Sequence, residues 1–174
     1  MEVYLIRHTE TVCEKGICYG QSDVKIQEPY LELFAEIKNQ IPKDSIVYSS
    51  PLFRCIELAN YVASSPIIRD DRLMEMNFGD WEMVNWDAIP PDDFAPWMND
   101  FVNVAVPNGE AFTDLYDRVV DFMEDELQKG HTKPIVIVAH AGVIRSVLCK
   151  ISNLPLKDAF QNKVDFGAVI KIEI

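Results

Sequence analysis

Positive charge is scarce in this sequence. It contains 16 Lys and Arg residues against 28 Asp and Glu residues, which gives a formal net charge of −12 at pH 7. Nucleic-acid backbones are bound through patches of Lys and Arg, so this balance argues against a nucleic-acid partner. Any site for an anion must gather its positive charge locally, because the molecule as a whole gives an anion little long-range attraction.

Long apolar runs and paired cysteines are also lacking. No apolar segment is long enough to cross a bilayer, and the N-terminus has no basic region followed by an apolar stretch. We therefore expect a cytoplasmic protein with no membrane partner. The four cysteines form no CxxC pair, and Cys55 and Cys149 fall on apolar faces of predicted helices. We expect reduced thiols, which leaves only a disulfide between Cys13 and Cys18 open.

Histidine is scarce too, and its placement is the most informative feature of the chain. An apolar run at 3–6 leads into Arg7 and His8, and a second run at 135–139 leads into His140. Short runs rich in Val and Ile predict strands buried on both faces, as in a parallel sheet. Ligands of open α/β sheets bind beyond the carboxyl ends of the strands. Two of the three histidines are therefore expected where such a fold binds its ligand.

Predicted strands and helices alternate along the 174 residues. Further strands are predicted at 45–49, 67–68 and 170–174, the last half-exposed at a sheet edge. Apolar residues at helical spacing predict helices near 30–41, 50–63, 112–127 and 143–151. This alternation predicts one domain over residues 1–174 with an α/β fold. We expect a three-layer sandwich whose central, mainly parallel sheet is flanked by helices.

Two local patterns refine this prediction. Ser50-Pro51 predicts a helix start, with a capping residue and then proline at the first helical position. Residues 83–108 are rich in Pro, Asp and aromatic side chains, and we expect an irregular or short-helical insertion over one face of the sheet. Its Trp86 and Trp97 either cover the core or form a wall for a flat ligand.

The predicted strand ends gather groups suited to a phosphate. Arg54 follows the second strand, in the first turn of a helix, and joins Arg7, His8 and His140. Ala141 then begins a helix, whose free N–H groups favour an anion. Arginine forks match phosphate oxygens in geometry and charge. Since no Gly-rich Walker loop or Cys-based phosphate loop is present, an imidazole is the candidate nucleophile, through a phosphohistidine that water hydrolyses.

A leaving alkoxide needs a proton, so a carboxylic acid is expected near the phosphate. The candidates are Glu75, Asp80 and Glu82. Each carboxylate could instead cap or solvate a surface segment, and each arginine could form a surface ion pair. The joint placement of two arginines and two histidines at strand ends favours the phosphoryl site.

Four segments together resemble the histidine phosphatase superfamily, also called phosphoglycerate-mutase-like. They occur in the family's order at 5–11, 49–55, 73–82 and 138–145. The resemblance implies that His8 is the phosphorylated nucleophile and that Glu75 is the proton donor, with Glu82 as second choice. It implies no metal or other cofactor. It assigns the remaining phosphate contacts to Arg7, Arg54, His140 and the backbone N–H of Ala141.

Two positions depart from the family's pattern. Thr9 stands where the family often has glycine after the nucleophilic histidine. Glu14-Lys15 stands where members commonly place an asparagine near the phosphate, so Thr11 or Gln21 is expected to replace that contact.

The segments 18–23 and 108–112, with the short chain, look most like α-ribazole phosphatases of cobalamin biosynthesis. That resemblance implies a small-molecule phosphate ester as partner, α-ribazole 5′-phosphate. The alternatives are a broad small-molecule phosphatase, a phosphoglycerate mutase, a metal-dependent hydrolase using both histidines and a carboxylate, and a non-catalytic phosphate-binding module. The oligomeric state is left open, a homodimer included.

Overall fold

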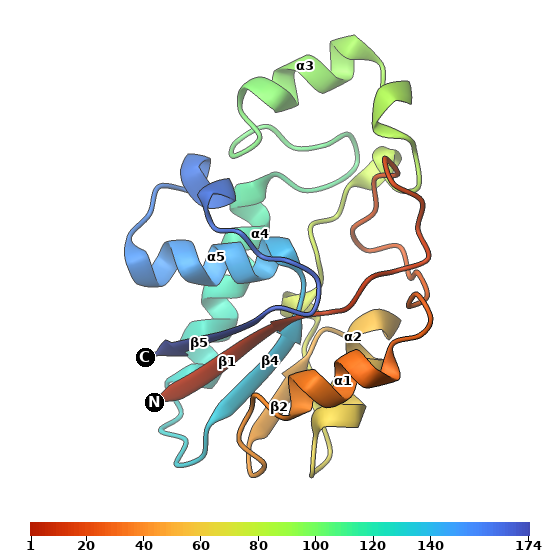
Figure 1. The fold of residues 1–174 in the computed structure, drawn as a ribbon. Helices are drawn as coiled ribbons and strands as arrows, with labels where there is room; N and C mark the ends of the chain where they lie inside the picture. Colours follow the sequence, from red (N-terminus) through yellow and green to blue (C-terminus); the bar gives the residue numbers. More distant parts are fainter.

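The structure is a computed structural model that describes all 174 residues. At its centre lies a five-stranded sheet in the order β3-β2-β4-β1-β5 (Figure 1). The strands are β1 Glu2–Arg7, β2 Ile46–Ser49, β3 Ile68–Arg69, β4 Ile135–Ala139 and β5 Val169–Glu173. All neighbours pair in parallel except β5, which runs antiparallel to β1 at the edge. The mainly parallel sheet and its C-terminal edge strand are thus confirmed.

Helices cover both faces of this sheet. On one side lie α1 Leu31–Lys38 and α2 Phe53–Val62, and on the other α4 Phe112–Phe122 and α5 Ala141–Ser152 (Figure 1). After α4 the chain continues as one π-helical segment, Met123–Leu127. The expected three-layer α/β sandwich is therefore confirmed. No helix is both long and apolar enough to span a membrane.

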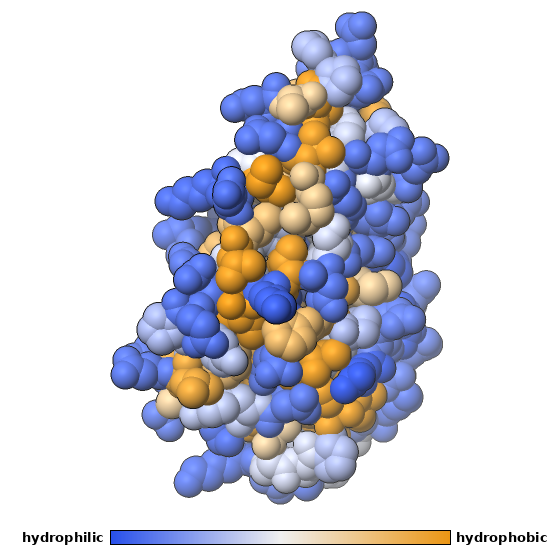
Figure 2. All heavy atoms as spheres, turned by 90° about the vertical axis from the view of Figure 1, so that its right-hand side faces the viewer, coloured by the Kyte–Doolittle hydropathy of each residue, from blue (hydrophilic) through white to orange (hydrophobic).

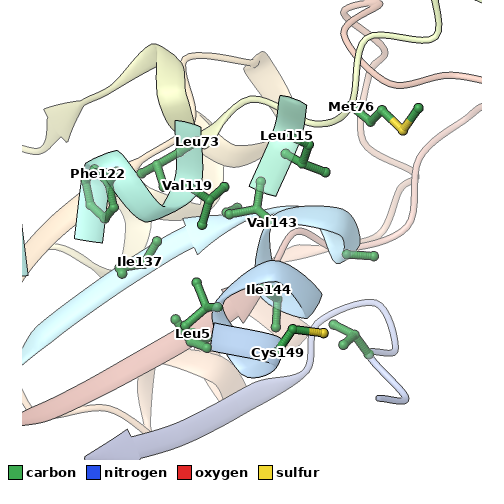
Figure 3. Close-up of a cluster of buried hydrophobic side chains, with 14 of the residues drawn as sticks. Leu5, Leu73, Met76, Leu115, Val119, Phe122, Ile137, Val143, Ile144 and Cys149 are labelled. Atoms are coloured by element: carbon green, nitrogen blue, oxygen red, sulfur yellow. The ribbon is translucent and has the colours of Figure 1, made fainter. Parts of the chain in front are cut away.

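Alternating side chains of the central strands belong to two separate hydrophobic cores, one on each face of the sheet. In β4, Val136 and Val138 pack with the α1–α2 layer, while Ile135 and Ile137 pack with the α4–α5 layer. Figure 3 shows the second cluster, in which Ile137 faces side chains of α4 and α5. Burial on both faces explains why β4 reads as a continuous apolar run.

The predicted start of the helix at Ser50-Pro51 was wrong, because α2 begins at Phe53. Ser50 extends the sheet ladder, donating its backbone N–H to Val138 O at 3.0 Å. Its hydroxyl lies 2.8 Å from Nε2 of His140. Ser50 therefore belongs to the carboxyl end of the sheet, and the helix starts two residues later than predicted.

The expectation that residues 83–108 lie over a face of the sheet was also wrong. Their helix α3, Pro91–Asn99, stands at the top of Figure 1, beyond α4 and α5. The aromatic side chains of the insertion pack against one another and against the end of the core cluster that contains Trp81 and Phe112. The indoles of Trp86 and Trp97 stack with centroids 5.9 Å apart.

The surface carries both hydrophilic and hydrophobic side chains. Hydrophilic side chains dominate the face in Figure 2, and a broken stripe of hydrophobic ones runs down it. All four cysteines are free thiols, as expected, so Cys13 and Cys18 form no disulfide.

Candidate active site

The two histidines meet because their strands are neighbours. Arg7 is in register with Ala139, and His8 donates its backbone N–H to Ala139 O at 3.1 Å. His8 and His140, the next residue on each chain segment, therefore lie side by side, with ring centroids 5.1 Å apart. Both are buried, His140 completely. Parallel pairing thus places both imidazoles at one edge of the sheet, as the sequence predicted.

Two arginines flank these histidines, and each retains an unused donor. Arg54 is fully buried and donates to backbone carbonyls of the loop 20–22. Arg7 donates to Val164 O at 2.7 Å and stacks 3.7 Å above the ring of Phe166. The Nε atom of each arginine is buried without a hydrogen-bond partner. A buried, unpaired cationic donor is costly, and an anion between the two arginines would satisfy both.

These groups open onto a cleft of about 250 Å³. Its walls include Arg7, His8, Arg54 and Glu75, together with Tyr19. His140 lies behind His8 and does not line the cleft. Its neighbour Ala141 is the first residue of α5, where backbone N–H groups have no partner within the helix. The cleft thus offers two guanidinium groups and an imidazole to one small anion, with the carboxyl group of Glu75 beside them.

The environment keeps both imidazoles neutral. Burial, followed by the charges of Arg54 and Arg7, lowers the pKa of His8 to about 3. Burial and the charge of Arg54 likewise lower the pKa of His140 well below its usual value. Nδ1 of His8 lies 2.8 Å from Thr9 O. Because a carbonyl only accepts, this contact assigns the proton to Nδ1 and leaves the lone pair on Nε2.

Glu75 is held at the amino end of α5. Its carboxylate accepts from the backbone N–H of Gly142 at 3.1 Å and from that of Met76 at 3.0 Å. Glycine is needed at position 142, since a Cβ there would lie 2.2 Å from Oε1 of Glu75. The close approach of helix and carboxylate therefore depends on one residue without a side chain.

A second, apolar cavity of about 220 Å³ begins on the other side of Glu75. Its charged lining residues are Glu75 and Arg145. Its aromatic walls are Phe78, Trp86, Trp97, Phe101, Phe112 and Phe160. Because Glu75, Phe78 and Trp86 line both spaces, Glu75 lies at the junction between the cationic cleft and the aromatic cavity.

A family model described as "Histidine phosphatase superfamily (branch 1)" matches residues 3–174. The chain belongs to the histidine phosphatase superfamily.

Relatives with this fold include named phosphatases. The adenosylcobalamin/alpha-ribazole phosphatase of Escherichia coli K12 is 28% identical, over 100% of this chain and 90% of its own. Phosphoserine phosphatase 1 of Hydrogenobacter thermophilus is 24% identical, over 90% of this chain and 78% of its own. The crystal structure of the Shigella flexneri alpha-ribazole phosphatase matches with a TM-score of 0.90 at 29% identity, covering 100% of this chain and 91% of that one. This histidine phosphatase is a phosphoric monoester hydrolase that acts on small phosphate esters.

Glu82, the second candidate acid, anchors a loop of the histidine phosphatase. Its carboxylate accepts from the backbone N–H groups of Gly20, Gln21, Ser22 and Phe78 at 2.9–3.2 Å. Burial acts to raise the pKa of Glu82, but these hydrogen bonds outweigh it and hold the pKa below its usual value. Glu82 lines neither cavity and fixes the loop whose carbonyls receive Arg54.

Thr11 and Gln21 do not line the cleft. The Thr11 hydroxyl donates to the Tyr19 hydroxyl at 3.0 Å, and the Gln21 amide donates to Glu75 O at 3.0 Å. Gln21 thus supports the backbone of Glu75.

Three residues near the site had no role in the sequence reasoning. Arg145 lines the aromatic cavity, its Cζ lying 4.8 Å above the ring of Phe160. Arg118 and Glu110 form an ion pair at 2.8 Å behind Glu75. In the sequence, the segment 108–112 draws attention to Glu110 but not to Arg118. It does not indicate which backbone atoms the Arg118 side chain contacts.

Proposed function

We propose that this enzyme hydrolyses phosphate monoesters through a phosphohistidine on His8. The observation that carries the proposal is the neutral, buried His8, with a free Nε2 lone pair, between two arginines whose Nε atoms lack partners. An imidazole that stays neutral can attack phosphorus, and the arginines can stabilise the charge on the transferring oxygens.

In the first step, Nε2 of His8 forms a bond to phosphorus while the bond from phosphorus to the ester oxygen breaks. Arg7 and Arg54 hold the nonbridging oxygens, aided by the backbone N–H of Ala141, while the neutral His140 packs against the ring of His8. Glu75 donates a proton to the leaving oxygen, so the alcohol departs neutral. In the second step, Glu75 takes a proton from water as the water oxygen attacks phosphorus. The N–P bond breaks, and phosphate and neutral His8 are regenerated.

Position favours Glu75 over Glu82 as the acid. The ester oxygen links the phosphate to the rest of the substrate, so it must lie where the cationic cleft meets the space for the leaving group. Glu75 lines both spaces and Glu82 lines neither.

We propose α-ribazole 5′-phosphate as the substrate. The aromatic cavity beside Glu75 suits a flat, apolar base, and the stacked Trp86 and Trp97 offer a platform for it. Similarity to alpha-ribazole phosphatases over the full chain supports the same choice.

A second candidate is a small phosphate ester that carries a carboxylate, such as phosphoserine. One observation favours it: the half-buried Arg145 lies in the leaving-group cavity, where its guanidinium could pair with a carboxylate.

The test measures phosphate release in EDTA from α-ribazole 5′-phosphate, phosphoserine, 3-phosphoglycerate and p-nitrophenyl phosphate. We expect turnover without a divalent metal and the highest kcat/KM for α-ribazole 5′-phosphate. A preference for phosphoserine that Arg145→Met abolishes would support the second candidate. Loss of all turnover in EDTA, restored by a divalent metal, would contradict the phosphohistidine mechanism.

A further inference from the structure

We infer that Arg118, together with Glu110, is a positioning residue that holds Glu75 at the junction of the two cavities. The inference rests on the proposed role of Glu75 as proton donor. Arg118 itself lines neither cavity, so it acts through Glu75 and not on the substrate.

Every N–H donor of the Arg118 guanidinium has a partner. Nε and Nη2 donate to the two carboxylate oxygens of Glu110 at 2.8 and 2.9 Å. Nη1 donates to Arg72 O at 2.8 Å and Met74 O at 2.6 Å. Nη2 also donates to Glu75 O at 2.9 Å. The side chain of Arg118, on α4, thus donates to three backbone carbonyls in the segment that ends at Glu75. We call Arg118 and Glu110 with these hydrogen bonds the clamp.

Glu110 completes the clamp from the opposite side. Its carboxylate accepts the backbone N–H of Asn77 at 2.8 Å, and its own N–H donates to Asn77 O at 2.8 Å. Gly109 allows this contact, because a Cβ there would lie 2.4 Å from Asn77 O. The backbone is therefore fixed immediately before and after Glu75, with Arg118 and Glu110 bonded to each other.

The clamp limits where the carboxylate can sit. The carbonyl of Glu75 accepts from both Arg118 and Gln21, and its carboxylate accepts from the N–H of Gly142. These hydrogen bonds fix both the backbone and the carboxyl group of Glu75. If the clamp is weakened, a small shift of the backbone would displace the carboxyl proton relative to the leaving oxygen of the substrate. Displacements near 1 Å at a reacting group cost on the order of 100-fold in rate.

Arg118→Lys is the decisive variant, since lysine keeps the charge but offers three donors from one atom in place of a planar fork. We expect kcat to fall about 10-fold or more on an alkyl phosphate and less than about threefold on p-nitrophenyl phosphate, whose leaving group needs no proton. In a Glu75→Gln background the same substitution should change kcat on neither substrate by more than about twofold.

Arg69→Lys is the matched control, because Arg69 is exposed on the edge strand β3 and lines neither cavity. It should leave the ratio of the two kcat values unchanged. Glu110→Gln provides a second variant if Arg118→Lys does not fold, and it should shift the ratio in the same direction.

Equal losses on both substrates, or a loss that persists in the Glu75→Gln background, would overturn the inference. The inference would also be overturned if Glu75→Gln changes the ratio of the two kcat values and Arg118→Lys does not. In that case the proposed function would still stand. If Glu75→Gln itself leaves the ratio unchanged, the acid assignment in the proposed function fails instead.

Discussion

At the scale of single residues, burial decides the chemistry. His8 and His140 are surrounded by protein and by two guanidinium groups, and both effects disfavour the imidazolium form. The guanidinium groups of Arg7 and Arg54 lie beside these imidazoles and keep unpaired Nε donors. Attack on a phosphate dianion requires a neutral nucleophile beside positively charged groups that bind the anion, and His8 with the two arginines provides this combination.

Replacing His8 with alanine should abolish turnover. We expect kcat on p-nitrophenyl phosphate to fall by roughly 1,000-fold or more, because no other group in the cleft can form the covalent intermediate. Acid-quench trapping with a radiolabelled substrate should show label on the wild type and none on His8→Ala. His131→Ala is the control, since His131 contacts Glu126 O away from the cleft. Label retained by His8→Ala would place the nucleophile elsewhere.

Replacing Glu75 with glutamine should separate good and poor leaving groups. Loss of the proton donor should slow hydrolysis of an alkyl phosphate by roughly 100-fold or more. Hydrolysis of p-nitrophenyl phosphate should slow far less, and the ratio of the two kcat values is the measurement. Glu82→Gln should lower the thermal midpoint without changing that ratio, because Glu82 anchors the 20–22 loop. The reverse pattern would transfer the acid role to Glu82.

At the scale of elements, the site is built where strand ends meet a helix start. β1 and β4 deliver the histidines, α2 delivers Arg54, and the first turn of α5 receives the Glu75 carboxylate. The N–H groups in the first turn of a helix have no partner within the helix and can donate to a carboxyl oxygen. The α5 start therefore holds the candidate acid in place and lies next to the phosphate cleft.

Gly142→Ala should disable this arrangement. The added Cβ would lie 2.2 Å from Oε1 of Glu75 and 2.8 Å from Cδ2 of Leu115, so the carboxylate must move. We expect the alkyl-phosphate activity to drop at least about 10-fold, with a smaller loss on p-nitrophenyl phosphate. Gly130→Ala is the control for activity: a Cβ there meets nothing within 4 Å, and its φ of +71° strains an alanine, so stability should fall while both activities stay unchanged. Full activity of Gly142→Ala would show that Glu75 needs no such anchor.

At the scale of the whole molecule, the buried histidines link stability to pH. In the unfolded chain His8 binds a proton as the pH falls below its ordinary pKa of 6.5, whereas in the folded protein it stays neutral until the pH nears its lowered pKa of about 3. The unfolded state then binds more protons than the folded state, so the free energy of unfolding falls as the pH is lowered through this window. Burying these imidazoles in the neutral form therefore lowers the free energy of unfolding only at acidic pH.

The expected slope rises from about 0.7 kcal/mol per pH unit at pH 6.5 toward about 1.4 kcal/mol per pH unit below pH 5.5 for each such histidine. Urea unfolding at several pH values measures it, and His8→Asn should show a shallower slope than the wild type. Identical slopes for the two proteins would mean that His8 is protonated in the folded state within this range.

Much of the fold follows from local pattern alone. The apolar runs before His8 and His140 predicted β1 and β4, because strands buried on both faces need continuous apolar sequence. The alternation of Ile170, Ile172 and Ile174 with polar residues predicted an edge strand, because a strand with one exposed face needs apolar residues only at every second position. The start of α2 and the place of residues 83–108 were missed, because both depend on what other parts of the chain already cover or bond.

The sequence by itself determined the family, the α/β alternation and the residues suited to bind phosphate. Which carboxylate faces the cleft was decided only by the tertiary structure. The residues alone left both Glu75 and Glu82 open, and only the family resemblance preferred Glu75. In the fold, five hydrogen-bond donors surround Glu82, whereas Glu75 lies at the start of α5. The reason is physical: strand and helix patterns are encoded by neighbours along the chain, whereas the surroundings of a side chain come from distant segments.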